Sequence, residues 1–177
     1  MLLQESIALI SQETFKPSGQ QLWYDLGAGT GMFTMALAHL LDERSKIVAV
    51  DRNASSLRQI PATMNNVVIE TQHSDFTKSA LPYQHADGIL MANSFHYVKN
   101  KKALIHRLAT NLKPLHSFLI IEYDTEKWNP WVPFPISFLS LKKFFEDEGY
   151  ESVIKLNDRK SAYGRSMMYA AIIRNKN

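Results

Sequence analysis

Three of the seven glycines of this 177-residue chain lie within five positions, Gly27 to Gly31, directly after the apolar run Leu22-Trp23-Tyr24-Asp25-Leu26. The run is typical of a buried strand, and the breaker-free segment 32–41 that follows is typical of a helix. Glycines between a strand and a helix permit a tight turn and let a ligand approach the free N–H groups at the start of the helix. This segment therefore predicts a ligand-binding loop at one edge of a sheet.

The alternation of strands and helices continues along the chain. Apolar runs predict strands at 46–50, 67–69, 88–91 and 118–122, and helices are expected at 2–15, 54–60, 101–112 and 137–148. Two further strands, 152–156 and 167–173, are expected to pair antiparallel, with a reversal suggested by the Asn157-Asp158 and Tyr163-Gly164 steps. Because strands that are apolar throughout are typical of parallel sheets covered on both faces, we expect a single-domain α/β fold.

Composition excludes several classes of protein. The chain has no cysteine, which rules out disulfides, cysteine-ligated zinc, iron–sulfur clusters and a cysteine nucleophile. With 45% hydrophobic residues and a formal charge of +3, it is not a disordered chain. No apolar run approaches the roughly 20 residues of a transmembrane helix, and the N-terminus lacks the basic start of a secretory signal. We expect a soluble, cytoplasmic protein without a metal or a membrane partner.

Two acids beside the glycines indicate which ligand binds. Asp51 ends the second strand, where an acid typically accepts hydrogen bonds from ribose hydroxyls. Met32 stands where the dinucleotide fingerprint G-x-G-x-x-G would have its third glycine, and no lysine follows the loop as in a P-loop. Asp25, just before the loop, would repel a pyrophosphate but would pair with an ammonium group. S-adenosylmethionine (SAM), which carries an adenosine and an ammonium, fits these features.

These segments resemble the class I SAM-dependent methyltransferases. The resemblance is carried, over residues 21–123, by LWYDLGAGTGMFTMALA, IVAVDRN, HSDF and ADGILMANSFHYV. It implies a Rossmann-like, seven-stranded, mostly parallel sheet whose last strand is antiparallel, with helices on both faces. Within one domain, 1–177, we then expect an N-terminal helix and turn (1–19), a cofactor-binding half (20–123), an aromatic and proline-rich loop (124–136), and a closing helix and strand pair (137–177).

The resemblance also implies roles for individual residues around SAM and its product S-adenosylhomocysteine. Asp25 and the loop Gly27-Ala28-Gly29-Thr30-Gly31 would hold the methionine part. Asp51 would take the ribose hydroxyls, with Arg52 beside the adenine. Asp75 would meet the adenine amino group, although it could instead be a loop cap, and Phe76 would lie against the ring face or offer its backbone N–H. Asn93 and Ser94 would supply backbone contacts near the sulfonium.

The sequence departs from the family pattern in ways that bear on the substrate. Lys113-Pro114-Leu115-His116 replaces the frequent Lys-Pro-Gly-Gly turn before the fifth strand. The Asn/Asp-Pro-Pro-aromatic motif of amino-group nucleic-acid methyltransferases is absent, since Asn93-Ser94-Phe95-His96 stands there. Without cysteine, methylation of pyrimidine C5 through a covalent adduct is also excluded.

Acceptor chemistry is expected at the same edge of the sheet. His96, after the fourth strand, is the best candidate for a general base, with the role of a partly exposed packing residue as the alternative, and Tyr97 is a weaker candidate. His39, His73, His85, His106 and His116 are expected to have structural or surface roles. On the proline-stiffened loop after the fifth strand, Trp128, Trp131 and Phe134 are expected to line the acceptor pocket with His96, or alternatively to cover an exposed edge of the core. Glu122 and Asp124 could face the acceptor or cap the loop. The N-terminal helix closes over the cofactor or pads the sheet.

Three functions are compatible with these features. The leading hypothesis is a methyltransferase that acts on a small-molecule acceptor by in-line displacement. The second is an RNA methyltransferase, suggested by the basic residues within 99–113 and 151–177, which alternatively belong to a solvated helix start and a charged tail. The third is a non-catalytic SAM-binding subunit, because the chain is short for the family and has no separate substrate domain.

Overall fold

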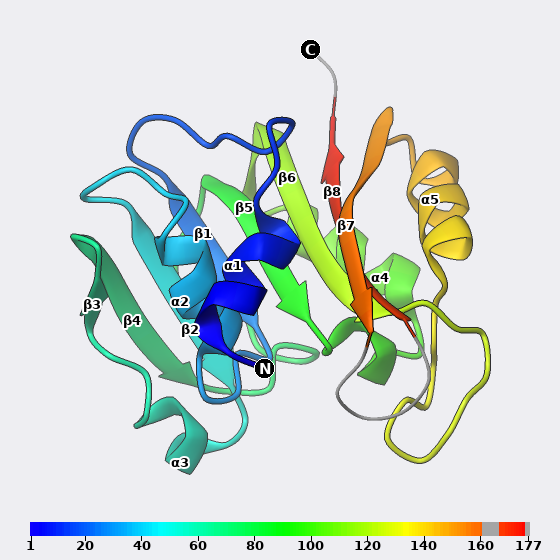
Figure 1. The fold of residues 1–177 in the computed structure, drawn as a ribbon, viewed down its shortest axis with the longest axis horizontal. Coiled ribbons are helices and arrows are strands. Elements are labelled where there is room, and N and C mark those ends of the chain that lie inside the picture. Colours follow the sequence, from blue (N-terminus) through cyan, green and yellow to red (C-terminus); the bar gives the residue numbers. More distant parts are fainter. Residues whose placement is uncertain (161–166, 176–177) are drawn as a thin grey trace.

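A twisted sheet lies between two layers of helices in the computed structural model, which describes residues 1–160 and 167–175 (Figure 1). The described strands are β1 (Leu22–Leu26), β2 (Lys46–Asp51), β3 (Thr63–Met64), β4 (Val67–His73), β5 (Ala86–Ala92), β6 (Leu112–Tyr123), β7 (Ser152–Lys160) and β8 (Met167–Arg174). Their order across the sheet is β3-β4-β2-β1-β5-β6-β8-β7.

The sheet has the expected Rossmann-like arrangement. β4, β2, β1, β5 and β6 run parallel to one another, and β8 is antiparallel to both β6 and β7. The prediction of a mostly parallel sheet whose last strand is antiparallel is therefore confirmed. The described residues add one strand to the expected seven, the two-residue β3, which pairs antiparallel with the edge strand β4.

Helices cover both faces of the sheet. Alternate residues of each central strand point to opposite faces, and both sets are mainly apolar, so each face is buried by a layer of helices. α1 (Leu3–Ile10), α2 (Met32–Ala38) and α3 (Ala54–Leu57) pack on one face, and α4 (Lys101–Ala109) and α5 (Phe138–Asp147) pack on the other. In β1, for example, Trp23 packs in the hydrophobic core beneath α1, α2 and α3, whereas Tyr24 packs in the core beneath α4 and α5. Both side chains are buried. A single 3₁₀ turn, η1 (Phe95–Tyr97), follows β5.

The N-terminal helix is shorter than the predicted 2–15. It ends at Ile10, and its last carbonyls are held by a side chain from the far end of the chain, since Asn157 Nδ2 donates to the carbonyls of Ala8, Leu9 and Ser11. α1 packs on α2 and β7, so it pads the sheet.

Two predicted turns are incorporated into strands. Asn157-Asp158 lies inside β7, because the pairing of β7 with β8 continues to Lys160 opposite Met167. The suggested turn at Tyr163-Gly164 lies outside the described residues. Lys113-Pro114 belongs to the twelve-residue strand β6, which is longer than the predicted 118–122. Among the helices of the described ranges, none has the length and apolar character to span a membrane.

Candidate active site

The glycine loop joins β1 to α2 at the carboxyl ends of the central strands. Gly27, Gly29 and Gly31 all have positive φ, at 82°, 55° and 82°, which glycine adopts without strain. A Cβ on Gly27 would lie 2.5 Å from Ser94 Cβ, and one on Gly31 would lie 2.7 Å from Ile60 Cγ1. Among the described residues, no atom beyond the two chain neighbours of Gly29 lies within 4 Å of its Cβ position, so the middle of the loop has open space in front of its backbone.

Asp25 lies beneath this loop and is 1% exposed. Its Oδ2 accepts a hydrogen bond from Thr34 Oγ1 at 2.5 Å, whereas its Oδ1 has no partner among the described residues. Burial raises the pKa of Asp25 to about 7; the Thr34 hydrogen bond lowers it and the charge of Asp51 raises it further. A cationic ligand group would relieve both the desolvation and the repulsion between the two acids.

Asp51 ends β2 and holds the glycine loop in place. Its Oδ2 accepts the Gly29 N–H at 2.8 Å, and its Oδ1 accepts the Asn53 N–H at 2.7 Å. Each carboxylate oxygen can accept a second hydrogen bond, so the ribose role predicted for Asp51 is sterically and chemically compatible with these contacts. The loop-holding contact was not predicted from the sequence.

The residues predicted around the adenine lie on the loop after β4. Asp75 accepts from the Thr77 N–H at 2.9 Å and the Thr77 hydroxyl at 2.6 Å, which lowers the pKa of Asp75. It therefore caps the loop, the alternative role, and its Oδ2 lies 3.6 Å from Lys78 Nζ. Phe76 is 9% exposed, with its ring 3.5 Å from the Cβ position of Gly27, and Arg52 is exposed.

Asn93 and Ser94 leave β5 beside the glycine loop. Ser94 is buried and donates its hydroxyl hydrogen to the Leu26 carbonyl at 2.5 Å, which ties this segment to the end of β1. Asn93 has φ of 52°, and its Oδ1 is buried without a partner among the described residues. The two predicted residues thus lie next to the glycine loop.

Unpartnered buried polar atoms collect at this edge of the sheet. Native proteins pair nearly all buried polar groups, because an unpaired one costs about 1–3 kcal/mol. In the described ranges, most of the exceptions lie at or after the carboxyl ends of β1, β4 and β5: Asp25 Oδ1, Gln72 Oε1, Ser74 Oγ, Asn93 Oδ1 and His96 Nε2. Gln72 and Ser74 were not predicted; their position at the end of β4 was the available signal.

A cavity of about 760 Å³ opens beside Asn93. This volume is within the range usual for small-molecule sites, about 300–1,000 Å³. Its walls come from the ends of β5 and β6 and the loop after β6: Asn93, His96, Tyr97, Tyr123, Thr125, Asn129, Trp131 and Val132. The cavity brings together four predicted residues: Asn93, His96, Tyr97 and Trp131.

Trp131 lines the cavity wall and is 77% exposed. The other two aromatic residues predicted for the pocket lie outside its lining. Trp128 is also largely exposed but is not among the lining residues, and Phe134 is not among them either. The Phe134 N–H instead donates to the His96 carbonyl at 3.0 Å, which anchors the loop to η1.

His96 is buried against Glu122, the last-but-one residue of β6. Its Nδ1 lies 2.7 Å from Glu122 Oε2, and its backbone N–H donates to Glu122 Oε1 at 3.0 Å. His96 and Glu122 are 2% and 1% exposed. The interpretation of His96 as a partly exposed residue is therefore wrong. The sequence alternatives for Glu122 were acceptor contact or loop capping, and its contact with His96 was missed.

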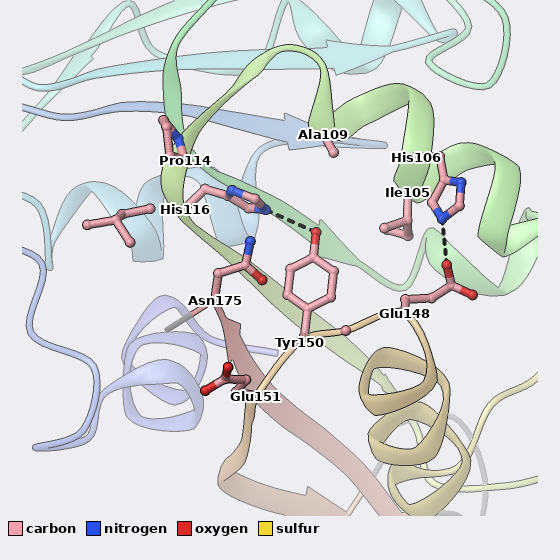
Figure 2. Close-up of a pocket in the computed structure, with 11 residues that line it drawn as sticks. Ile105, His106, Ala109, Pro114, His116, Glu148, Tyr150, Glu151 and Asn175 are labelled. Atoms are coloured by element: carbon pink, nitrogen blue, oxygen red, sulfur yellow. Dashed lines mark hydrogen bonds and ion pairs between the residues drawn. The ribbon is translucent and has the colours of Figure 1, made fainter. Parts of the chain in front are cut away.

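A second cavity of about 510 Å³ lies at the opposite, amino edge of the strands (Figure 2). There His116 Nε2 lies 3.0 Å from the Tyr150 hydroxyl and His116 Nδ1 lies 2.7 Å from the Lys113 carbonyl. His106 Nε2 lies 2.5 Å from Glu148 Oε2 (Figure 2). These contacts are structural, as expected for both histidines.

Most of the basic residues of 99–113 are engaged within the chain. Lys102 pairs with Glu148 at 2.8 Å and Lys113 with Asp87 at 2.6 Å. Lys101 donates to the carbonyls of Val98 and Phe134, and Arg107 donates to those of Phe76 and Ser79. This stripe is therefore largely an internal network.

Comparison with known proteins gives a consistent result. A family model described as "Methyltransferase domain" matches residues 24–115. The ubiquinone/menaquinone biosynthesis C-methyltransferase UbiE of Shewanella frigidimarina is 30% identical over 107 residues, which are 58% of this chain and 43% of that protein. The chain thus spans less than half the length of this curated relative.

Solved structures share the fold. The YcgJ protein of Bacillus subtilis aligns with a TM-score of 0.70 at 12% identity, covering 98% of this chain and 99% of that one. A SAM-dependent methyltransferase of Aquifex aeolicus aligns with a TM-score of 0.61 at 22% identity, covering 86% and 82%. With the family model matching more than half of the residues, the chain belongs to the methyltransferase domain family and has the class I architecture of enzymes that use S-adenosylmethionine.

Proposed function

We propose that this chain is a SAM-dependent methyltransferase that acts on a small-molecule acceptor. The observation that carries the proposal is the cluster of unpartnered buried polar atoms around the glycine loop, directly beside a ligand-sized cavity. Polar atoms left unpaired in a folded chain are stabilised when a ligand pairs with them, and this pairing contributes to ligand affinity.

The residues present fit the cofactor. Asp25 Oδ1 would accept from the ammonium of the methionine part, the open backbone at Gly29 would lie against that part, and Asp51 would accept from the ribose hydroxyls. Asp75, Phe76 and Arg52 would surround the adenine, with the cap at Thr77 fixing the loop. When bound, SAM supplies a methyl group on a sulfonium, an electrophile with a good leaving group.

The chain's residues contribute position and shelter. Asn93 and Ser94 lie between the loop and the cavity, so they would hold the two ligands against each other. Segment 20–123 would be the cofactor half, and the loop 124–136, with Trp131, would be the acceptor wall. Holding two reactants in line can account for much of the acceleration of a displacement. His96 would be the proton acceptor, and Tyr97 would cover it, because the ring centroids lie 4.3 Å apart.

A small molecule is the better-supported acceptor. The cavity is the size of a small-molecule site, and the UbiE relatives are C-methyltransferases of ubiquinone and menaquinone biosynthesis. An RNA acceptor would require a free basic surface, whereas the lysines and arginine of 101–113 are held by internal contacts.

Calorimetry with S-adenosylhomocysteine tests the cofactor assignment. We expect wild-type binding, and a loss of about tenfold in affinity for Asp51→Ala. Unchanged affinity in that variant, or no binding to the wild type, would contradict the assignment. Transfer of labelled methyl from SAM into a small-molecule cell extract tests the activity. Label in RNA alone would favour the RNA alternative, and no turnover despite binding would favour a non-catalytic subunit.

A further inference from the structure

The His96–Glu122 pair has a defined proton arrangement. The backbone N–H of His96 is a donor, so Glu122 Oε1 must accept. Both oxygens of a carboxylate are acceptors, so with Glu122 in its carboxylate form the 2.7 Å contact at Oε2 places a proton on His96 Nδ1. The neutral imidazole then has its lone pair on Nε2, the ring nitrogen that has no partner among the described residues.

The surroundings of His96 indicate which kind of molecule could donate a hydrogen bond to the Nε2 lone pair. The described residues that line the cavity are mainly aromatic and amide side chains, and none of these described residues is Lys, Arg, Asp or Glu. Tyr97 and Tyr123 lie beside the imidazole, with ring centroids 4.3 Å and 6.1 Å from it. A wall of this kind favours a flat and uncharged molecule, because a charged one would lose hydration without a charged partner.

We propose that the acceptor is an uncharged aromatic compound with a phenol-type hydroxyl, and that His96 Nε2 takes its proton while Glu122 positions the imidazole. The proposal rests on the proposed methyltransferase function and names its substrate class. His96 is the catalytic residue, and Glu122 acts through it.

The step balances without another reactant. The O–H bond of the acceptor breaks, and its proton bonds to Nε2 through the lone pair there. The electron pair left on the oxygen forms the new O–CH₃ bond, and the methyl–sulfur bond breaks with its pair remaining on sulfur. The imidazolium that results lies against the Glu122 carboxylate, which stabilises it, and its proton then passes to water.

The first experiment reads the tautomer directly and needs no turnover. ¹⁵N NMR of histidine-labelled wild type is expected to show His96 with Nδ1 protonated and Nε2 unprotonated in its neutral form. His116→Gln removes the other buried histidine signal for assignment. A neutral His96 protonated on Nε2 would overturn the proposal.

The same NMR measurement compares wild type with Glu122→Gln, whose single amide oxygen cannot accept from both His96 donors. We expect the variant to lose the preference for the tautomer protonated on Nδ1, because the carboxylate oxygen beside that nitrogen is gone. An identical tautomer ratio in both proteins would contradict the positioning role.

The second experiment varies the acidity of the acceptor. A naphthol, uncharged in mildly alkaline buffer, is compared with a nitrophenol, which is largely ionised there. We expect Glu122→Gln to lower kcat about 100-fold for the naphthol but only a few-fold for the nitrophenol, with little change in KM. His116→Gln is the matched control and is expected to lower neither rate.

The contrary results are separable from failure of the proposed function. Equal losses on both acceptors would make Glu122 merely structural. If neither phenol is methylated while S-adenosylhomocysteine binds and an amine, thiol or ring carbon is methylated instead, the substrate class is wrong but the enzyme is a methyltransferase. Should Glu122→Gln not fold, Glu122→Asp and the wild-type tautomer still decide.

Discussion

The buried histidines at the two edges of the sheet differ in the hydrogen-bond partners of their ring nitrogens. At the amino edge, His116 has a partner at each ring nitrogen, the Tyr150 hydroxyl and the Lys113 carbonyl. At the carboxyl edge, His96 has Glu122 at Nδ1 and no partner at Nε2 among the described residues. Both side chains are at most 8% exposed, so burial alone does not distinguish them.

Unsatisfied hydrogen-bonding capacity is what separates a site from a packing contact here. The amino-edge cavity also has polar side chains in its walls, but both ring nitrogens of His116 already have hydrogen-bond partners. The carboxyl edge keeps acceptors free on Asp25, Asn93 and His96, each next to the glycine loop or the larger cavity. A folded protein retains buried polar atoms without partners where a bound ligand supplies the missing hydrogen bonds.

Exchanging each buried histidine should give the largest contrast. His96→Gln is expected to lower kcat about 10²- to 10⁴-fold, because it removes the proton acceptor. His116→Gln should leave kcat unchanged and lower only the stability. Methyl-transfer assays with thermal unfolding of both variants provide the comparison, and similar activity losses in the two would abolish it.

Asp25→Asn should have the next largest effect. The amide keeps the shape of the side chain but loses the charge that would pair with an ammonium, so we expect a roughly 10- to 100-fold weaker affinity for S-adenosylhomocysteine. Calorimetry measures it, with Thr34→Val as the matched control that alters the other carboxylate oxygen. An Asn variant that binds as tightly as wild type would remove Asp25 from the cofactor site.

The same variant should change the pH dependence of folding. Burial raises the pKa of Asp25 from 3.8 to about 7, so within that window the folded chain binds a proton that the unfolded chain has released. This group's contribution to stability is present below pH 3.8 and is lost as the pH rises towards 7. Urea unfolding across this pH range should show a smaller decline of the unfolding free energy for Asp25→Asn than for wild type. An equal decline in both proteins would contradict the raised pKa assigned to Asp25.

The smallest expected effect belongs to His116. Burial lowers the pKa of its imidazole below 6.5, so the unfolded chain binds a proton more readily. The stability from neutral His116 is present above pH 6.5 and decreases as the pH falls through the folded-state pKa. His116→Gln should therefore flatten the acid side of the stability profile slightly, by about 1 kcal/mol or less. A steeper acid side in the variant would argue against this.

The sequence predicted the sheet well, because its strands are continuous apolar runs, which are typical of strands buried on both faces. β1 begins and ends where the run Leu22–Leu26 does. Helix ends were less predictable: α1 stops at Ile10, where its last carbonyls meet the Asn157 side chain, a contact between residues about 150 positions apart.

The contents of the site could be only partly predicted. Position after a strand was enough to single out Asp51, Asn93 and His96. The pairing of His96 with Glu122 was not, because it depends on two neighbouring strands ending at the same level, with Ala92 opposite Ile121. The shared carboxyl edge of β5 and β6 was the signal that could have suggested it.

A crystal structure with S-adenosylhomocysteine bound tests the account most directly. We expect the ligand's amino group within hydrogen-bond distance of Asp25 Oδ1, its ribose at Asp51, and its sulfur facing the cavity that His96 and Trp131 line. A ligand whose sulfur faces away from that cavity, or which binds at the amino-edge cavity beside His116 instead, would contradict the assignment of the carboxyl edge as the active site.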